Sequence, residues 1–293
     1  MTPTAAASRV DTLVQALDQA RRAGPLKDLV IPPCPDLMVR LQGALAAPEP
    51  DLGAVAAIAA HDVAMAATLM RRANGPLHAA AQPVRTVGQA LNRLGLDTTA
   101  AVMTEFLAVR AIRVRHPALL RFWERSARRA AAMDFIARRL PGLSPDLAHS
   151  FGLFCHVGMP VLLQCVRDYA GTMVEADARI DRSCVATENA NHRTDHAVVG
   201  ALVCRTWRLS TTLVGAVRLH HDLFSLGADD VEPEVHTLVA AGLLAEHLMR
   251  RAECLPPDRD WGDHAASALQ WLALTADELD AWEEPLWAVF DAL

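Results

Sequence analysis

Apolar residues recur every three to four positions along most of this chain, and glycines, prolines and small polar residues interrupt the pattern at short intervals. Such spacing places apolar side chains on one face of a helix. Residues 9–23 show it, and it is clearest after Thr275-x-x-Glu278, where Leu279, Trp282 and Leu286 follow. No segment in the first half alternates with a period of two, as a half-buried strand does. The pattern predicts an all-α protein with essentially no sheet.

Helix ends are marked by residues whose side chains cap free backbone groups. The following positions predict helix starts: Asp51, Asp62, Thr86 with Gln89 three residues later, Asp97, Ser144 before Pro145, and Thr275. Glycine and proline predict helix ends at Gly24-Pro25 and at Gly95. Residues 181–195 are polar and rich in capping residues, so we expect a loop or a short turn there.

One polar side chain, His156, lies inside the otherwise apolar run 150–163. Gly158 and Pro160 follow it closely, and proline disfavours the α conformation in the residue before it. We therefore expect one helix to end near His156 and another to begin at Pro160.

Composition narrows the functional classes. The net charge of −6 at pH 7 gives no general attraction to nucleic acid or to an anionic membrane, so we expect no nucleic-acid partner. The N-terminus lacks the layout of a signal peptide, and no stretch approaches 18 uninterrupted apolar residues, so we expect a cytoplasmic protein without membrane association. The 6 cysteines are scattered without a C-x-x-C pair, which indicates neither a disulfide framework nor a zinc knuckle.

The run around His156 resembles the "G-L-L-H-D-I-G" segment of the HD superfamily of metal-dependent phosphohydrolases, in which the His-Asp doublet supplies two metal ligands. Here the doublet is His156-Val157, and valine cannot bind a metal. The resemblance also implies an earlier histidine ligand, in the segment where the related text reads "L-W-R-H-S". Arg125 takes that place, and its permanent charge would repel a divalent cation.

A second resemblance covers more of the chain. The segments Pro32-Pro-Cys-Pro-Asp-Leu, 60–74, 83–96 and Asp195-His-Ala-Val-Val-Gly-Ala-Leu-Val are similar, in order and spacing, to motifs of the HDOD domain, from about residue 29 to 250. This resemblance implies an HDOD/HD-domain-like helical bundle with two packed helical subdomains. We expect an N-terminal helix or extension over 1–26, an HDOD N-terminal subdomain over 27–113, and an HD-like subdomain with C-terminal helices over 116–293.

Histidines remain at three ligand-like positions: His156, His196, and either His220 or His221. One interpretation is a vestigial site for a single metal ion, helped by Asp195 or Asp222. The other, which we favour, is that they are core or rim histidines bonded to backbone carbonyls, because imidazoles without a hard carboxylate leave no catalytic anion. We therefore expect no catalytic residues, no metal and no cofactor.

The function implied by the HDOD resemblance is regulation. We expect a non-catalytic bacterial signalling protein that contacts other signalling proteins, in a pathway controlling cyclic-di-GMP, motility or virulence. The alternative is an HD-type phosphohydrolase or cyclic-nucleotide phosphodiesterase that uses the residual histidines. Arg71, Arg72 and Asn74 are the candidate partner surface, against the alternative that Asn74 is a helix C-cap. The sequence does not give the partner, the stimulus or the oligomeric state.

Overall fold

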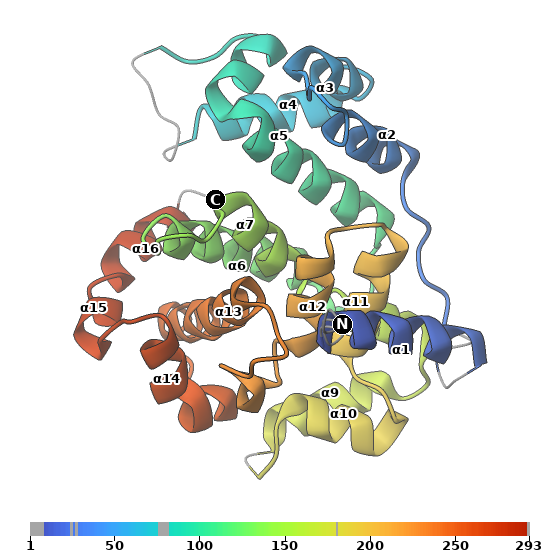
Figure 1. Cartoon of the computed structure of the whole chain (residues 1–293), viewed down its shortest axis with the longest axis vertical. Coiled ribbons are helices and arrows are strands. Elements are labelled where there is room, and N and C mark those ends of the chain that lie inside the picture. Colours follow the sequence, from blue (N-terminus) through green and yellow to red (C-terminus); the bar gives the residue numbers. More distant parts are fainter. Residues whose placement is uncertain (1–8, 24–25, 27–28, 76–81, 180, 292–293) are drawn as a thin grey trace, which may run out of the picture. The chain divides into compact units, whose positions relative to one another are not determined.

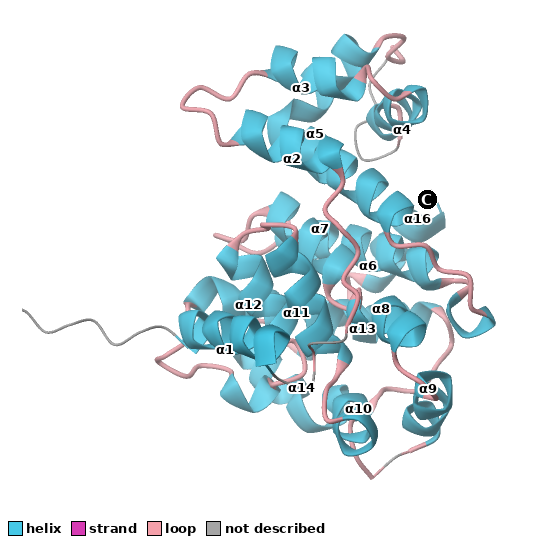
Figure 2. Cartoon of the chain, turned by 90° about the vertical axis from the view of Figure 1, so that its right-hand side faces the viewer, coloured by secondary structure: helices cyan, strands magenta, loops and turns pink. Residues whose placement is uncertain are grey.

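A computed structural model describes residues 9–23, 26, 29–75, 82–179 and 181–291 of the 293-residue chain. Helices make up 71% of the structure, and no strand occurs among the described residues (Figure 2). The prediction of an all-α protein is confirmed.

The chain forms two compact units. The smaller unit comprises residues 33–113 and 285–293 and the larger one residues 1–32 and 114–284. The smaller unit contains α2 (Asp36–Leu45), α3 (Leu52–Ala59), α4 (Val63–Ala73), α5 (Val87–Ala111) and most of α16 (Glu283–Asp291). Its helices α3 and α4 both pack against α5 (Figure 1). The side chains of Met38, Leu41, Met65 and Leu69 are fully buried.

The larger unit holds the remaining helices. They are α1 (Arg9–Ala23), η2 (Pro117–Leu119), α6 (Phe122–Ala137), α7 (Pro145–Phe154), α8 (Gly158–Cys165), α9 (Tyr169–Ala178), α10 (Cys184–His192), α11 (His196–Thr206), α12 (Thr211–Leu219), η3 (Leu223–Ser225), α13 (Pro233–Ala252), α14 (Arg259–Trp271) and α15 (Ala276–Asp280). Helix α6 packs on α7 and α13, α11 packs on α8 and α12, and α9 lies beside α10 (Figure 1).

The predicted caps account for where many helices begin. The side chains of Asp51, Asp62 and Thr86 accept backbone N–H groups at the starts of α3, α4 and α5. Thr275 and Glu278 form the expected capping box of α15. Gly95 has φ 79° and ψ 173°, which interrupts α5 where the sequence predicts a helix end. Gly24 and Pro25 lie outside the described residues.

Residues 181–195 correct the sequence-based expectation. Instead of a loop or short turn, they form α10, which Ser183 caps by accepting the Ala186 N–H. The buried residues of this helix are Thr187 and Glu188, which are both polar. A helix that buries polar side chains shows no apolar stripe, so its periodicity is invisible in the sequence.

The break beside His156 lies about two residues earlier than predicted. Helix α7 ends at Phe154 and α8 begins at Gly158, so Pro160 is the third residue of α8, not its first. Proline is tolerated there because backbone N–H groups in a first helical turn have no intrahelical partner. A Cβ atom on Gly158 would lie 2.1 Å from the carbonyl oxygen of His196 and 2.7 Å from the nitrogen of Gly200. Gly158 therefore permits α8 and α11 to approach closely.

By length and composition, Pro145–Cys165 is the one segment of the described residues that could cross a membrane, with a hydropathy of 1.2. It spans α7, the break at residues 155–157 and α8. Of that window, 67% is buried inside the protein, as in a core helix of a globular fold.

A buried ion pair joins α6 to α13. The Arg129 guanidinium donates to Glu246 Oε2 from Nε at 3.1 Å and from Nη2 at 2.7 Å. Arg125 bonds Glu246 at 3.0 Å and Glu253 at 3.0 Å. Burial disfavours both charges, yet the attraction of Glu246 raises the pKa of Arg129, and the two arginines lower the pKa of Glu246. Two cations and two carboxylates thus neutralise one another.

We expect Gly158→Ala to destabilise the fold by about 1–3 kcal/mol, because the added methyl group meets backbone atoms that cannot move aside. Thermal and urea unfolding monitored by circular dichroism measure the change. Gly171→Ala is the matched control: Gly171 is exposed in α9, and nothing lies within 4 Å of its added Cβ. Equal stabilities of the two variants would contradict the close approach of α8 and α11.

We expect Glu246→Leu to cost about 3–5 kcal/mol of unfolding free energy, because it leaves the buried Arg129 without its carboxylate. The double variant Arg129→Met/Glu246→Leu should recover most of that loss, since both charges are removed. Arg259→Ala breaks an exposed ion pair with Asp263 and should change stability by less than about 0.5 kcal/mol. A double variant no more stable than Glu246→Leu would refute this interpretation.

Candidate functional site

Four histidines of the larger unit converge. His156 lies in the break between α7 and α8, His196 is the first residue of α11, and His220 and His221 directly follow α12. Each offers one ring nitrogen, and these nitrogens all lie within 4.8 Å of one another. The His156 ring centroid is 5.1 Å from that of His196 and 5.1 Å from that of His220. The structure therefore brings together all four histidines singled out in the sequence.

A buried glutamate orients His196. Glu188 Oε2 accepts the Nδ1–H of His196 at 2.8 Å and its backbone N–H at 2.9 Å. The other oxygen, Oε1, accepts the hydroxyl of Tyr169 at 2.5 Å. Both the Glu188 and His196 side chains are 0% exposed. Because both carboxylate oxygens are engaged, the imidazole plane of His196 is fixed.

The paired histidines at the end of α12 are oriented in a similar way. His221 Nδ1 lies 2.5 Å from Asp260 Oδ2 at the start of α14, and His220 Nδ1 lies 2.7 Å from the carbonyl oxygen of Val217. Their other nitrogens point inward: His196 Nε2 is 3.3 Å from His220 Nε2 and 3.2 Å from His221 Nε2. His220 alone shows the backbone-carbonyl bond that the sequence analysis favoured for these histidines.

Burial and neighbouring charges shift the ionisation of the cluster. Burial lowers the pKa of His156 and of His220, and the charges of Arg129 and of the other histidines act in the same direction. Burial alone would raise the pKa of the Glu188 carboxyl, but attraction to His196 and the hydrogen bonds from His196 and Tyr169 lower it to about 2. Glu188 is therefore a carboxylate at neutral pH.

The carboxylates that support the cluster are not those expected from the sequence. Asp195 caps α11 by accepting the Val198 N–H at 2.8 Å, and Asp222 pairs with Arg9 at 2.7 Å. Glu188 and Asp260 hold the histidines instead. The sequence offered little signal for either, since each lies on a different helix from its histidine and outside any quoted motif.

The arginine whose charge acts on the cluster also differs from the prediction. Arg125 is engaged by Glu246 and Glu253, whereas Arg129, one helical turn later, is the arginine that lowers the pKa of His156. Glu246 pairs with Arg129, so Arg129 repels a cation less strongly than an unpaired guanidinium would.

The residues present do not fit the two-metal centre of an HD phosphohydrolase. Such a centre needs a carboxylate bridging the ions, and the position beside His156 is Val157, which is fully buried. Glu188 and Asp260 contact Nδ1 atoms, not the inward-facing Nε2 atoms. The cluster instead offers imidazole nitrogens, which suit a single transition-metal ion.

The three residues of the candidate partner surface at the end of α4 differ in their contacts and exposure. Asn74 is the C-cap of α4, and its side chain bonds both the N–H of Val84, at 2.7 Å, and the carbonyl oxygen of Val84, at 3.1 Å. Asn74 therefore has a local structural role, in agreement with the alternative interpretation that it is a helix C-cap. Arg71 is exposed, and its guanidinium approaches the Thr68 hydroxyl at 3.4 Å. Arg72 is partly exposed.

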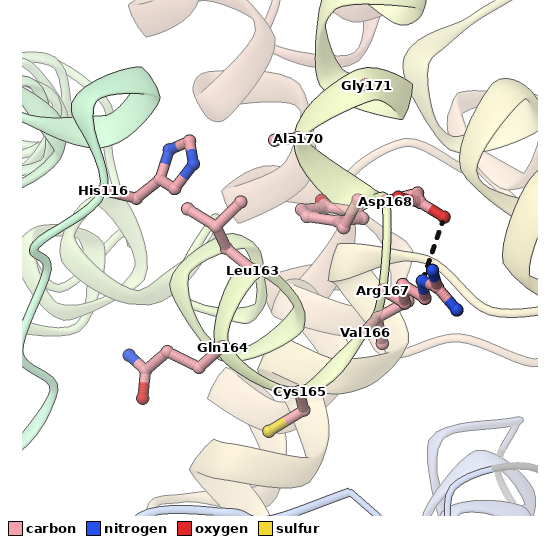
Figure 3. Close-up of a pocket in the computed structure, with 10 residues that line it drawn as sticks. His116, Leu163, Gln164, Cys165, Val166, Arg167, Asp168, Ala170 and Gly171 are labelled. Atoms are coloured by element: carbon pink, nitrogen blue, oxygen red, sulfur yellow. Dashed lines mark ion pairs between the residues drawn. The ribbon is translucent and has the colours of Figure 1, made fainter.

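A pocket of about 490 Å³ opens between the end of α8 and the start of α9 (Figure 3). Leu163 and His116 face one another across it, and Arg167 pairs with Asp168 at its rim at 3.7 Å. Tyr169, which also lines the pocket, is the residue whose hydroxyl holds Glu188. None of the four clustered histidines lines this pocket.

The fold has solved counterparts. The chain is 18% identical to a candidate signal transduction protein from Marinobacter aquaeolei VT8, covering 98% of this chain and 66% of that one with a TM-score of 0.74. It is 20% identical to an HDOD domain protein of unknown function from Geobacter sulfurreducens, covering 97% of each chain with a TM-score of 0.69. It is also 20% identical to a candidate phosphohydrolase from Shewanella amazonensis SB2B, covering 95% and 93% with a TM-score of 0.68.

An uncharacterized protein from Treponema pallidum (strain Nichols) is 21% identical over 223 residues, which are 74% of this chain and 42% of that protein. This chain thus spans less than half of that relative's length. The sequence profile of the HDOD domain matches residues 31–223. That match covers most of both units' helices, the turn with His156 and the histidines of α11 and α12, and the chain belongs to the HDOD domain family.

Proposed function

We propose that the protein is a non-catalytic signalling domain that acts by binding other proteins. The observation that carries this proposal is Val157, a fully buried valine beside His156, where a metal-dependent phosphohydrolase needs a carboxylate. Membership of the HDOD family and the similarity in fold to a candidate signal transduction protein are consistent with it.

The chemistry of hydrolysis supports the same conclusion. Two metal ions joined by a carboxylate hold a hydroxide between them and neutralise the developing charge on the phosphoryl group. The inward-facing atoms here are imidazole nitrogens, which are neutral ligands. The two nearby carboxylates, on Glu188 and Asp260, are occupied by the opposite sides of the histidine rings. No side chain of this cluster can bridge two ions.

The alternative is hydrolysis of a phosphate ester by a metal ion bound to His156, His196 and His220. The convergence of the histidines and the similarity in fold to a candidate phosphohydrolase favour it. It needs one coordination position free for water or substrate, as in catalytic zinc sites that have three protein ligands. His221, whose Nε2 lies 3.2 Å from His196 Nε2, would take that position in a four-histidine site.

We expect no metal-stimulated hydrolysis of cyclic-di-GMP, cyclic-di-AMP, (p)ppGpp or deoxynucleotides, because no carboxylate bridges the cluster. Product analysis by chromatography after incubation with manganese, iron or zinc measures this. Turnover that disappears in His156→Ala would refute the non-catalytic assignment. Val157→Asp alone should also be inactive, since Arg125 still takes the place of the earlier histidine, and its folding should be checked because a carboxyl group enters a buried position.

Protein contact requires an accessible surface, and we propose the exposed end of α4 around Arg71 and Arg72. Both arginines lie in the last turn of the helix. A partner with an acidic surface would complement this end. The cytoplasm is the proposed location, and a pathway involving cyclic-di-GMP, motility or virulence rests on the family resemblance alone.

We expect affinity capture on the purified chain to recover a specific partner, and Arg71→Glu/Arg72→Glu to weaken its binding by at least about tenfold, because reversed charges repel an acidic surface. Arg40→Glu is the matched control, since Arg40 is also exposed in the smaller unit, on α2. Circular dichroism checks that each variant folds. Equal binding by the folded double variant would refute the placement, and recovery of no partner would refute the adaptor role.

A further inference from the structure

The acceptors around the cluster determine which ring nitrogen of each histidine carries a proton. His196 Nδ1 faces the Glu188 carboxylate, His221 Nδ1 faces the Asp260 carboxylate, and His220 Nδ1 faces the Val217 carbonyl. Ionised carboxylates and carbonyl oxygens only accept hydrogen bonds, so each Nδ1 must donate. A neutral imidazole carries one ring proton. In their neutral forms, the Nε2 atoms of all three therefore present lone pairs.

These lone pairs point at one another. His196 Nε2 lies 3.3 Å from His220 Nε2 and 3.2 Å from His221 Nε2, with no donor hydrogen between them in these tautomers. His196 is 0% exposed, so water cannot surround its Nε2. Buried acceptors that face only other acceptors are unfavourable, because no hydrogen bond replaces those they made with water. A cation at the centre of the cluster would satisfy all of them together.

The spacing agrees with that of ligands sharing one ion. Nitrogens bound tetrahedrally at about 2.0–2.1 Å from a zinc ion lie about 3.3–3.4 Å apart, from the tetrahedral angle. The separations of 3.3 Å and 3.2 Å are close to this value. His156 is the candidate for the fourth nitrogen, because it belongs to the same group of four residues whose ligand atoms all lie within 4.8 Å of one another.

The charge around the cluster is also balanced for a divalent ion. Glu188 and Asp260 contribute two negative charges through the histidines that they contact. A carboxylate on the far side of a ligating histidine fixes its tautomer and increases its basicity. Arg129 and Arg125 are compensated separately by Glu246 and Glu253. A divalent cation with Glu188 and Asp260 thus forms a neutral assembly.

We propose that His156, His196, His220 and His221 bind one divalent transition-metal ion, with Glu188 and Asp260 as positioning residues. Imidazole ligands suit zinc, iron, nickel or copper, and the absence of oxygen ligands among these four residues disfavours magnesium and calcium. Zinc is the best fit because it adopts tetrahedral coordination without a preference imposed by its d electrons. Four protein ligands complete that coordination, so the ion stabilises the fold or responds to metal supply. This role goes beyond the proposed signalling function and does not depend on it.

The test uses the full chain, stripped with a chelator and then titrated with zinc alone. We expect one zinc ion per chain by elemental analysis, and the affinity is measured by competition with a chromophoric chelator. Cobalt substitution should give the intense visible absorption of a tetrahedral site. Zinc should also raise the midpoint of thermal unfolding, since a ligand that binds only the folded state stabilises it.

Variants locate the ion. His220→Ala/His221→Ala should lose at least about a hundredfold in zinc affinity, and Glu188→Gln about 10–100-fold, as expected for a residue that orients a ligand. The paired histidines are preferred to His196 for this test because they are partly exposed and their loss disturbs the core less. His61→Ala is the control: His61 is exposed and lies in the smaller unit, and its affinity should equal that of the unchanged protein.

Two results would overturn the proposal. If the unchanged protein holds no more zinc than the folded double variant, the lone pairs are satisfied by an additional proton and not by a metal. If cobalt gives the weak absorption of an octahedral site, the four-imidazole coordination is wrong. The hydrolysis assay is separate: turnover by the zinc-loaded protein would refute the non-catalytic function while leaving the metal site intact.

Discussion

The histidine cluster depends on Glu188, a carboxylate with no access to water. Burying an ionised carboxylate costs several kcal/mol unless hydrogen bonds replace those of water. Three donors on other helices do so here: the Tyr169 hydroxyl, the His196 backbone N–H and the His196 ring. They belong to α9 and α11, whereas Glu188 belongs to α10, so the charge ties three helices together. Because Glu188 accepts the Nδ1–H of His196, it fixes the direction in which His196 Nε2 points.

Sequence reasoning succeeds where a structure is decided by neighbours along the chain. The caps at Asp51, Asp62, Thr86 and Thr275 depend on backbone groups two or three residues away, and all were predicted. Helix α10 was missed because the side chains that it buries, including Glu188, are polar and find their partners in tertiary structure. A periodicity argument detects only helices that bury apolar faces.

For the candidate site, too, sequence reasoning identified some residues, the histidines, and missed others, their carboxylate partners. The four histidines were recognised because they lie in segments that resemble the family's motifs. Their carboxylate partners were not, since Asp260 is 39 residues beyond His221 and its distance in space cannot be read from spacing. That Arg125 takes the place of an earlier histidine ligand stays a prediction, whereas the arginine whose charge lowers the pKa of His156 is Arg129, one helical turn later on α6.

The positions of the carboxylates decide what chemistry the cluster can perform. An aspartate at position 157, as in the His-Asp doublet that this segment resembles, would supply a carboxylate able to join two ions that hold a hydroxide between them. Valine there leaves neutral ligands facing inward, while Glu188 and Asp260 supply negative charge from behind the rings. Charge behind the ligands strengthens the hold on one ion without providing a place for a second. With a fourth imidazole in place of water, the proposed ion would have no activated nucleophile, which is why we propose that this cluster binds an ion without hydrolysing a substrate.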